Sequence, residues 1–269
     1  MWGAIINSSR SWGMYVRSFI TNQFAESPVS DHELKSIQKR LIYRHIAWLF
    51  ALRSQLLVST EWEHLQQGGM VGRYARHYQK YFGVGLVDDE VTKSELTNYL
   101  AKEEYDRVIN FKNTATQLID HQSQDLKQLR ESGLTEDFRH MELQTLLKDF
   151  YDHQGKCERI KKFPIPRQYA NMSFVFIAIF IVLLPFGMIS EFAKLGEFGV
   201  WLSIPFNVTV GWIFVMMEIV GDYSENPFEG LANDIPMLSI CRTIEIDLKE
   251  MLGDEDIPAA IQSRNGVLM

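Results

Sequence analysis

The stretch QYANMSFVFIAIFIVLLPFGMIS, from Gln168 to Ser190, contains no charged residue, and neither does FGVWLSIPFNVTVGWIFVMM, from Phe198 to Met217. A helix rises about 1.5 Å per residue, so each stretch is long enough to cross the roughly 30 Å hydrocarbon layer of a bilayer. A short polar segment, Glu191 to Glu197, separates them. The pattern predicts a hairpin of two antiparallel transmembrane helices.

Core helices of a large soluble protein are the alternative interpretation of these two runs. The membrane is favoured because the rest of the 269-residue chain offers little that could bury both of them. The segment CERIKKFPIPR, from Cys157 to Arg167, places four basic residues just before the first run. Such residues stay on the cytoplasmic side, so we expect both ends of the hairpin inside and its connecting loop outside.

The overall composition excludes several classes of protein. The formal net charge is -7, so no basic surface supports a nucleic-acid partner. The two cysteines, Cys157 and Cys241, have no metal-type pairing, so we expect reduced thiols and no structural zinc. The first seventeen residues lack a continuous apolar core and a cleavage site, so they are not a signal peptide.

Helical periodicity dominates the part before the hairpin. An apolar stripe from Trp2 to Ile20 has no N-cap, which we interpret as a helix that continues upstream. A second helix is predicted from Asp31 to about Leu56, with His45 on its apolar face and Arg44 and Arg53 off that face. Gly68 and Gly69 are expected to end a short helix, and further helices are predicted over residues 102–132 and 135–155.

No stretch alternates with period two, so almost no sheet is expected. The fold class predicted is an all-α membrane protein with long cytosolic helices and a two-helix transmembrane hairpin. We divide the chain into a cytosolic helical region over 1–165, the transmembrane hairpin over 166–220, and a cytosolic C-terminal segment over 221–269.

Catalysis finds no support in the motifs. His64 and His140 have acidic neighbours but lack the i, i+4 spacing of metal ligands, so we interpret them as parts of solvated helices. We interpret His45 as a hydrogen-bonded core histidine. No phosphate loop or nucleophile motif occurs, so the chain is not expected to be an enzyme or to carry a cofactor or metal.

Ion conduction needs polar groups at membrane depth and an oligomer that encloses a path. Asn207 and Thr209 lie in the middle of the second run, and Glu218 lies at its inner end. Hydrogen bonds to neighbouring helices explain these residues equally well. Two helices cannot enclose a pore, so conduction would require a homo-oligomer.

Three motifs in order carry a resemblance to a known family. They are the Cys-Glu-Arg-Ile segment with two spaced prolines, the Asn-Pro-Phe step, and the Asn-Asp-Ile-Pro step before an amphipathic helix. These motifs resemble the bestrophin family of ion channels, and WGAIINSSRSW from Trp2 to Trp12 fits its early helices. The signature residues are Cys157, Glu158, Arg159, Pro164, Pro166, Asn226, Pro227, Phe228, Asn233, Asp234 and Pro236.

The resemblance implies a homopentamer with a central ion path, an apolar neck in the membrane and a second constriction in the cytosolic domain. The neck lies in the family upstream of the position of Trp2, so we expect the chain to be truncated at its N-terminus. Met141 is the candidate for the cytosolic constriction, and packing within a helical bundle is the alternative. Animal members bind calcium after Pro-Phe; here only Glu229 and Asp234 supply carboxylates, so no calcium gating is expected.

These observations predict a bestrophin-type channel that conducts anions such as chloride. It would act as a homo-oligomer, a pentamer by the resemblance, in the lipid bilayer of a bacterial inner membrane, with most of the chain cytoplasmic. A non-conducting membrane scaffold or fragment, and a cation-selective homologue, are the alternatives.

Overall fold

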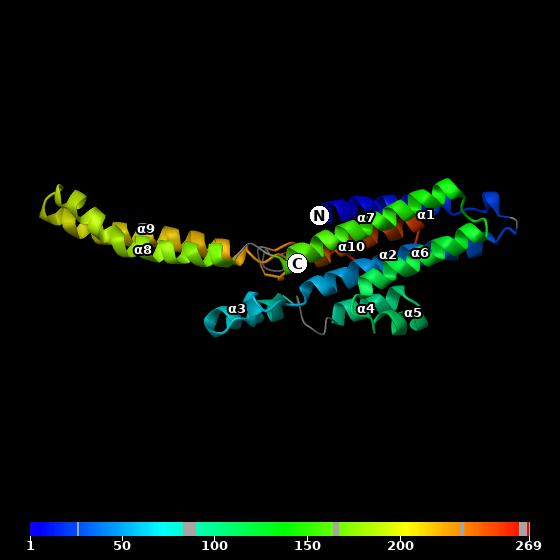
Figure 1. The fold of residues 1–269 in the computed structure, drawn as a ribbon, viewed down its shortest axis with the longest axis horizontal. Coiled ribbons are helices and arrows are strands. Elements are labelled where there is room, and N and C mark those ends of the chain that lie inside the picture. Colours follow the sequence, from blue (N-terminus) through cyan, green and yellow to red (C-terminus); the bar gives the residue numbers. More distant parts are fainter. Residues whose placement is uncertain (26, 83–89, 164–166, 232–233, 264–267, 269) are drawn as a thin grey trace. The chain divides into compact units, whose positions relative to one another are not determined.

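Helices are the regular secondary structure of the described chain. The computed structural model describes residues 1–25, 27–82, 90–163, 167–231, 234–263 and 268, and these ranges contain no strand. Figure 1 shows the elements, which are α1 (Trp2–Phe19), η1 (Asn22–Phe24), α2 (Asp31–Leu57), η2 (His64–Gln66), α3 (Gly69–Phe82), α4 (Glu90–Tyr99), α5 (Lys102–Val108), α6 (Thr114–Glu131), α7 (Asp137–Lys162), α8 (Arg167–Ala193), α9 (Glu197–Tyr223) and α10 (Met237–Leu252).

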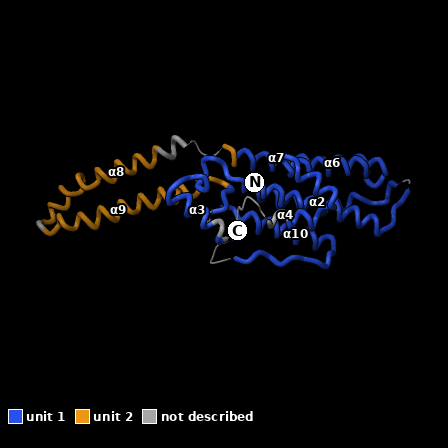
Figure 2. The backbone as a smooth tube through the Cα atoms, turned by 90° about the horizontal axis from the view of Figure 1, so that it is seen from below, with its two compact units in different colours: residues 1–160, 228–269 blue, residues 161–227 orange. Residues whose placement is uncertain are grey.

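Two compact units make up the fold. Unit 1 consists of Met1–Ile160 and Phe228–Met269, and unit 2 is Lys161–Pro227, as the colours of Figure 2 show. Helix α10 therefore packs with the N-terminal helices, although the whole of unit 2 separates them in the sequence.

The stripe predicted from Trp2 to Ile20 is confirmed as the buried face of α1. Trp12 and Val16 are fully buried, and the helix packs against α10 and α2. Its backbone comes very close to α10 at Gly13, where an added Cβ would lie 2.7 Å from Cδ2 of Leu248. Met1, the residue before α1, provides no side-chain cap, as expected from the sequence.

Helix α2 is the central element of unit 1. Ser30 caps it by accepting a hydrogen bond from the Glu33 N–H at 3.2 Å. The helix is buried on nearly all sides from Leu41 to Leu52, and Arg44 and Arg53, which the periodicity placed off the apolar face, are buried too. Arg44 is tolerated there because Glu104, at 2.5 Å, and Asp125, at 2.8 Å, neutralise its charge.

Three boundaries differ from the sequence-based expectation. The helix predicted over 135–155 continues to Lys162 as α7, because the first proline after Gly155 is Pro164. The helix predicted over 102–132 is broken into α5 and α6, because the Asn113 side chain accepts the Thr116 N–H at 2.9 Å and starts a new helix. Residues 64–66 form only a 3-10 turn, and Gly69, at φ +71°, begins α3 where the sequence suggested a helix end.

Unit 2 is a hairpin of α8 and α9, which pack side by side along their length. The turn between them contains Gly196 at φ +89°, a conformation that suits glycine. Pro185 and Pro205 lie inside the helices and do not end them. Met172–Ala193 and Phe198–Tyr223 are long and apolar enough to cross a membrane, and few of their residues are buried within the chain. This exposure favours lipid over a protein core.

Candidate functional site

A row of polar and small residues runs along the face of α9 that contacts α8. We call Ser203, Asn207, Gly211 and Glu218 the polar seam; they follow one another at steps of four and seven residues, which share a helix face. Glu218 accepts a hydrogen bond from the Ser173 hydroxyl of α8 at 2.8 Å. At Gly211 an added Cβ would lie 3.8 Å from Ile181, so α8 and α9 are in close contact there.

Asn207 and Thr209 both lie in the middle of α9 but have different surroundings. The Thr209 hydroxyl donates to the Pro205 carbonyl of its own helix at 2.8 Å and faces outward. The Asn207 Oδ1 is buried and has no hydrogen-bond partner among the described residues. An unpaired amide at membrane depth is costly, so it suits a polar group from another helix or from water in a pore.

The Pro-Phe motif forms a closed loop at the start of the C-terminal part of unit 1. The Asp234 carboxylate accepts three backbone hydrogen bonds, from Phe228 at 3.1 Å, Gly230 at 2.8 Å and Ile235 at 2.7 Å. Phe228 is fully buried and has φ +61°, a strained conformation for a bulky residue. The Asp234 carboxylate is therefore surrounded by backbone N–H groups. The positive ends of these N–H dipoles repel a cation.

Glu229 of this loop pairs with His64 of η2. The Glu229 Oε2 lies 2.8 Å from His64 Nδ1, and its Oε1 accepts the Leu65 N–H at 3.2 Å. Both side chains are 1% exposed, so the expectation that His64 is solvated is wrong. No local spacing could reveal the pair, because 165 positions separate its members.

The Cys-Glu-Arg motif lies near the end of α7. Cys157 is a buried free thiol, and burial raises its pKa to about 11. Glu158 accepts hydrogen bonds from Asn113 at 3.0 Å and Gln154 at 2.8 Å, which connects α7 to the start of α6. Arg159 is exposed. The motif thus contributes mainly to helix packing within unit 1.

The other signature residues are placed in part. Pro164, Pro166 and Asn233 lie outside the described residues. Asn226 and Pro227 follow the end of α9, and Pro236 directly precedes α10, where its carbonyl accepts the Ile240 N–H at 3.1 Å. These residues mark helix ends, which is the structural role expected of proline at such positions.

Met141 lies on the solvent-facing side of α7. Its side chain is 66% exposed, and that of Phe138, one turn earlier, is 80% exposed. Within a single chain Met141 is therefore not part of the bundle core, and it is free to face a path shared by several chains. Its role in a constriction stays a prediction.

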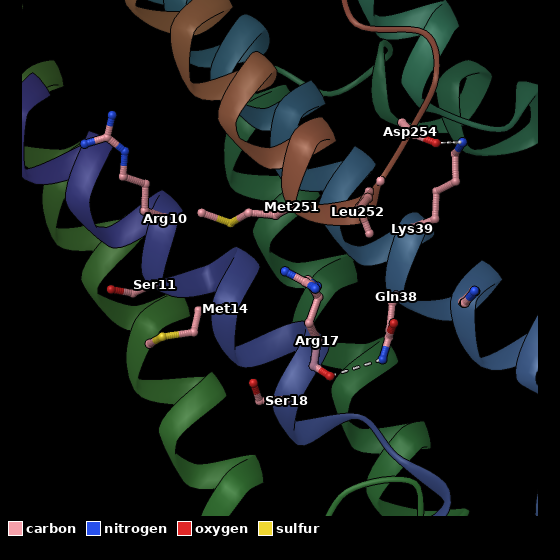
Figure 3. Close-up of a pocket in the computed structure, with 12 residues that line it drawn as sticks. Arg10, Ser11, Met14, Arg17, Ser18, Gln38, Lys39, Met251, Leu252 and Asp254 are labelled. Carbon is pink, nitrogen blue, oxygen red and sulfur yellow. Dashed lines mark hydrogen bonds and ion pairs between the residues drawn. The ribbon is translucent and has the colours of Figure 1, made fainter.

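A basic groove of about 1050 Å³ opens between α1, α2 and the end of α10 (Figure 3). Its cations are Arg10, Arg17, Lys35 and Lys39. Arg10 pairs with Asp247 at 2.7 Å and Lys39 with Asp254 at 2.6 Å, whereas Arg17 and Lys35 form no ion pair within the described ranges. The groove keeps excess positive charge and can attract anions.

A histidine in the core of unit 1 has a strongly shifted pKa. His45 is 3% exposed, its Nε2 lies 2.9 Å from the Ser9 hydroxyl, and burial lowers its pKa to about 3. It is the hydrogen-bonded core histidine predicted from the sequence.

Where the structure describes the chain, no three His, Cys, Asp or Glu side chains gather as a metal site.

Comparison with known proteins decides the family. The model of the bacterial and fungal bestrophin family matches residues 1–250. The chain belongs to the bestrophin family. Among solved structures, a bacterial bestrophin homologue from Klebsiella pneumoniae has the same fold as this bestrophin, with a TM-score of 0.72 at 18% identity over 95% of this chain and 77% of that one. The fold class predicted from the sequence is therefore confirmed.

The curated relatives of this bestrophin are called voltage-dependent anion channel-forming proteins. YneE of Salmonella typhi is 29% identical over 164 residues, which are 61% of this chain and 52% of the relative. The protein sll1024 of Synechocystis is 26% identical over 251 residues, which are 93% of this chain and 67% of the relative. The match to YneE thus covers about half the length of that relative.

Proposed function

We propose that this bestrophin is a subunit of a homo-oligomeric channel that conducts anions, chloride among them. The observation that carries the proposal is the family match over residues 1–250, together with the anion-channel function stated in the names of its relatives. The basic groove of unit 1 supports anions over cations, because a chain of net charge -7 nevertheless gathers excess positive charge there.

Unit 2 supplies the membrane anchor in this proposal. The outer surfaces of α8 and α9 are apolar and unburied, so lipid is the solvent that suits them. One hairpin cannot enclose an ion path, and the family resemblance favours a pentamer. Asn207 supports further association, because its buried Oδ1 finds no partner within the described part of one chain.

The basic residues just before the apolar run of α8 support one topology. Arg159, Lys161, Lys162 and Arg167 favour the cytoplasmic side of a bacterial inner membrane. Residues 1–165 and 221–269 would then be cytoplasmic, and residues 166–220 would form the membrane hairpin. Met141 would face the cytoplasmic part of the ion path, where a ring of methionines narrows it.

Ion flux from liposomes tests the proposal. The full-length protein, loaded into liposomes with separate chloride and sodium gradients, should release chloride and retain sodium. Release of sodium alone would support the cation-selective alternative. Absence of both fluxes from liposomes that contain inserted oligomers would support a scaffold and contradict a channel.

A further inference from the structure

Helix α3 differs in charge from the rest of this acidic chain. No Asp or Glu occurs between residues 64 and 87, while Arg73, Arg76 and Lys80 add three positive charges. In the described part of the chain, neither arginine meets a carboxylate: Arg73 Nε donates to the Gly69 carbonyl at 3.2 Å, and Arg76 Nη1 to the Leu65 carbonyl at 2.6 Å. Both guanidinium groups remain exposed and free to attract anions.

One side of α3 packs, and another exposes large apolar groups. Ala75 is fully buried, and at Gly72 an added Cβ would lie 1.8 Å from the Gln67 carbonyl, so this side lies against the η2 segment. Met70 is 79% exposed, Tyr74 53% and Tyr81 40%. At 100° per residue these three positions fall within an arc of about 40°, and the basic positions lie about 60–120° from Met70 on one side of that arc.

The position of α3 in the sequence and in unit 1 connects it to the end of a membrane span. Its neighbour η2 is held by the pair of His64 and Glu229. Glu229 follows Tyr223, the last residue of the α9 span, by six positions. Six residues extend at most about 20 Å, so η2 must lie near the membrane surface if α9 crosses the bilayer.

We propose that α3 lies in the headgroup region of the bilayer and binds anionic phospholipids. Met70, Tyr74 and Tyr81 would enter the boundary of the acyl chains, and Arg73 and Arg76 would contact lipid phosphates. A basic amphipathic helix with exposed tyrosines is the composition typical of such interfacial helices. The proposal rests on the membrane insertion of α8 and α9, but not on ion conduction.

Fluorescence quenching in nanodiscs tests this proposal. A fluorophore is attached in separate variants at Met70→Cys, Phe138→Cys and Ile213→Cys; Cys157 and Cys241 are fully buried and should remain unlabelled. Phe138, 80% exposed on α7, is the matched control for Met70, and Ile213 of α9 reports the hairpin. The quencher is a phosphatidylcholine that carries its nitroxide near the headgroup for positions 70 and 138, and on the acyl chain for position 213, which lies in the middle of the α9 span. Each is used with or without added phosphatidylglycerol.

In nanodiscs with phosphatidylglycerol, we expect the label at 70 to be quenched at least about twofold more than the label at 138. Arg73→Gln with Arg76→Gln should remove most of this difference, whereas Arg73→Lys with Arg76→Lys should retain it. Lys102→Gln with Lys112→Gln removes the same charge from exposed positions elsewhere in unit 1 and should leave the quenching unchanged.

Two results would overturn the proposal. Equal quenching at 70 and 138, with strong quenching at 213, would place α3 in water while leaving the channel proposal intact. A label at 70 that is shielded in the detergent-solubilised oligomer, yet unquenched in nanodiscs, would assign this face to contact with a second copy of the chain. Absence of quenching at 213 would instead contradict the hairpin and the proposed function.

Discussion

The imidazole of His64 lies 2.8 Å from the carboxylate of Glu229, and both side chains are almost completely shielded from solvent. The pair joins the segment after α2 to the first residues that follow unit 2. Because burial removes both groups from water, loss of this hydrogen bond is not compensated by solvent. The contact therefore fixes the point at which the chain re-enters unit 1.

Loss of either partner should destabilise unit 1. Glu229→Ala removes the buried carboxylate that lies against His64 and accepts the Leu65 N–H, and we expect a loss of about 1–3 kcal/mol of unfolding free energy. Thermal unfolding in detergent measures the effect. The double variant of Glu229→Ala and His64→Ala should lose less unfolding free energy than the two single variants lose together. If the losses of the two single variants simply add in the double variant, the contact contributes nothing to stability. As a control, Glu250→Ala on the exposed face of α10 should change the unfolding free energy little.

The Pro-Phe loop should depend on Asp234 rather than on calcium. Asp234→Asn replaces one of the two acceptor oxygens by an amide nitrogen, so the three backbone N–H groups can no longer all be paired. We expect a loss of about 1–3 kcal/mol of unfolding free energy.

Calcium should leave the wild-type melting temperature unchanged and give no binding heat in a calorimetric titration. The Asp234 oxygens already accept N–H groups, and hard cations need several free oxygen ligands. Tight calcium binding to the wild type that Asp234→Asn abolishes would contradict this interpretation of the loop.

Burial of His45 predicts that stability falls in acid. The folded-state pKa is lowered from 6.5 to about 3, so the unfolded chain binds the extra proton between these values. The unfolding free energy contributed by neutral, buried His45 is therefore complete above pH 6.5. It is lost as the pH falls toward 3, by at most about 1.4 kcal/mol per pH unit. Melting temperatures of the wild type and His45→Gln between pH 7 and pH 5 should converge; parallel curves would contradict the assignment.

A charge at Met141 should change conduction if α7 lines the ion path. Met141→Glu adds one negative charge per subunit at a side chain that is 66% exposed, and a ring of such charges repels anions. We expect chloride flux to fall by about tenfold or more, whereas Ile109→Glu at the end of α5 should leave it near the wild-type rate. Wild-type flux through Met141→Glu would remove this residue from the pathway.

The sequence predicts the elements with a strong local signal. The hairpin follows from two uncharged runs, and α1 and α2 follow from their apolar stripes, because helix periodicity is a local property. The break at Asn113 is not predicted, because the apolar pattern continues across it. A single side chain, that of Asn113, caps the next helix there.

Buried polar contacts could not be predicted in the same way. Arg44 looked like a surface residue because its partners, Glu104 and Asp125, lie on other helices, and His64 looked solvated because Glu229 is distant in the chain. The sequence reveals the motif residues more readily than their roles. Asp234 has the carboxylate of a metal ligand, but in the structure it accepts hydrogen bonds from backbone N–H groups. Such contacts depend on tertiary packing, which periodicity does not record.

Oligomers of this chain are proposed to form an anion-selective path across a bilayer. The most direct measurement is the reversal potential of the full-length protein in a planar bilayer that separates two concentrations of potassium chloride. An anion-selective path gives currents that reverse near the chloride equilibrium potential. Reversal near the potassium equilibrium potential, or silent bilayers despite inserted oligomers, would contradict it.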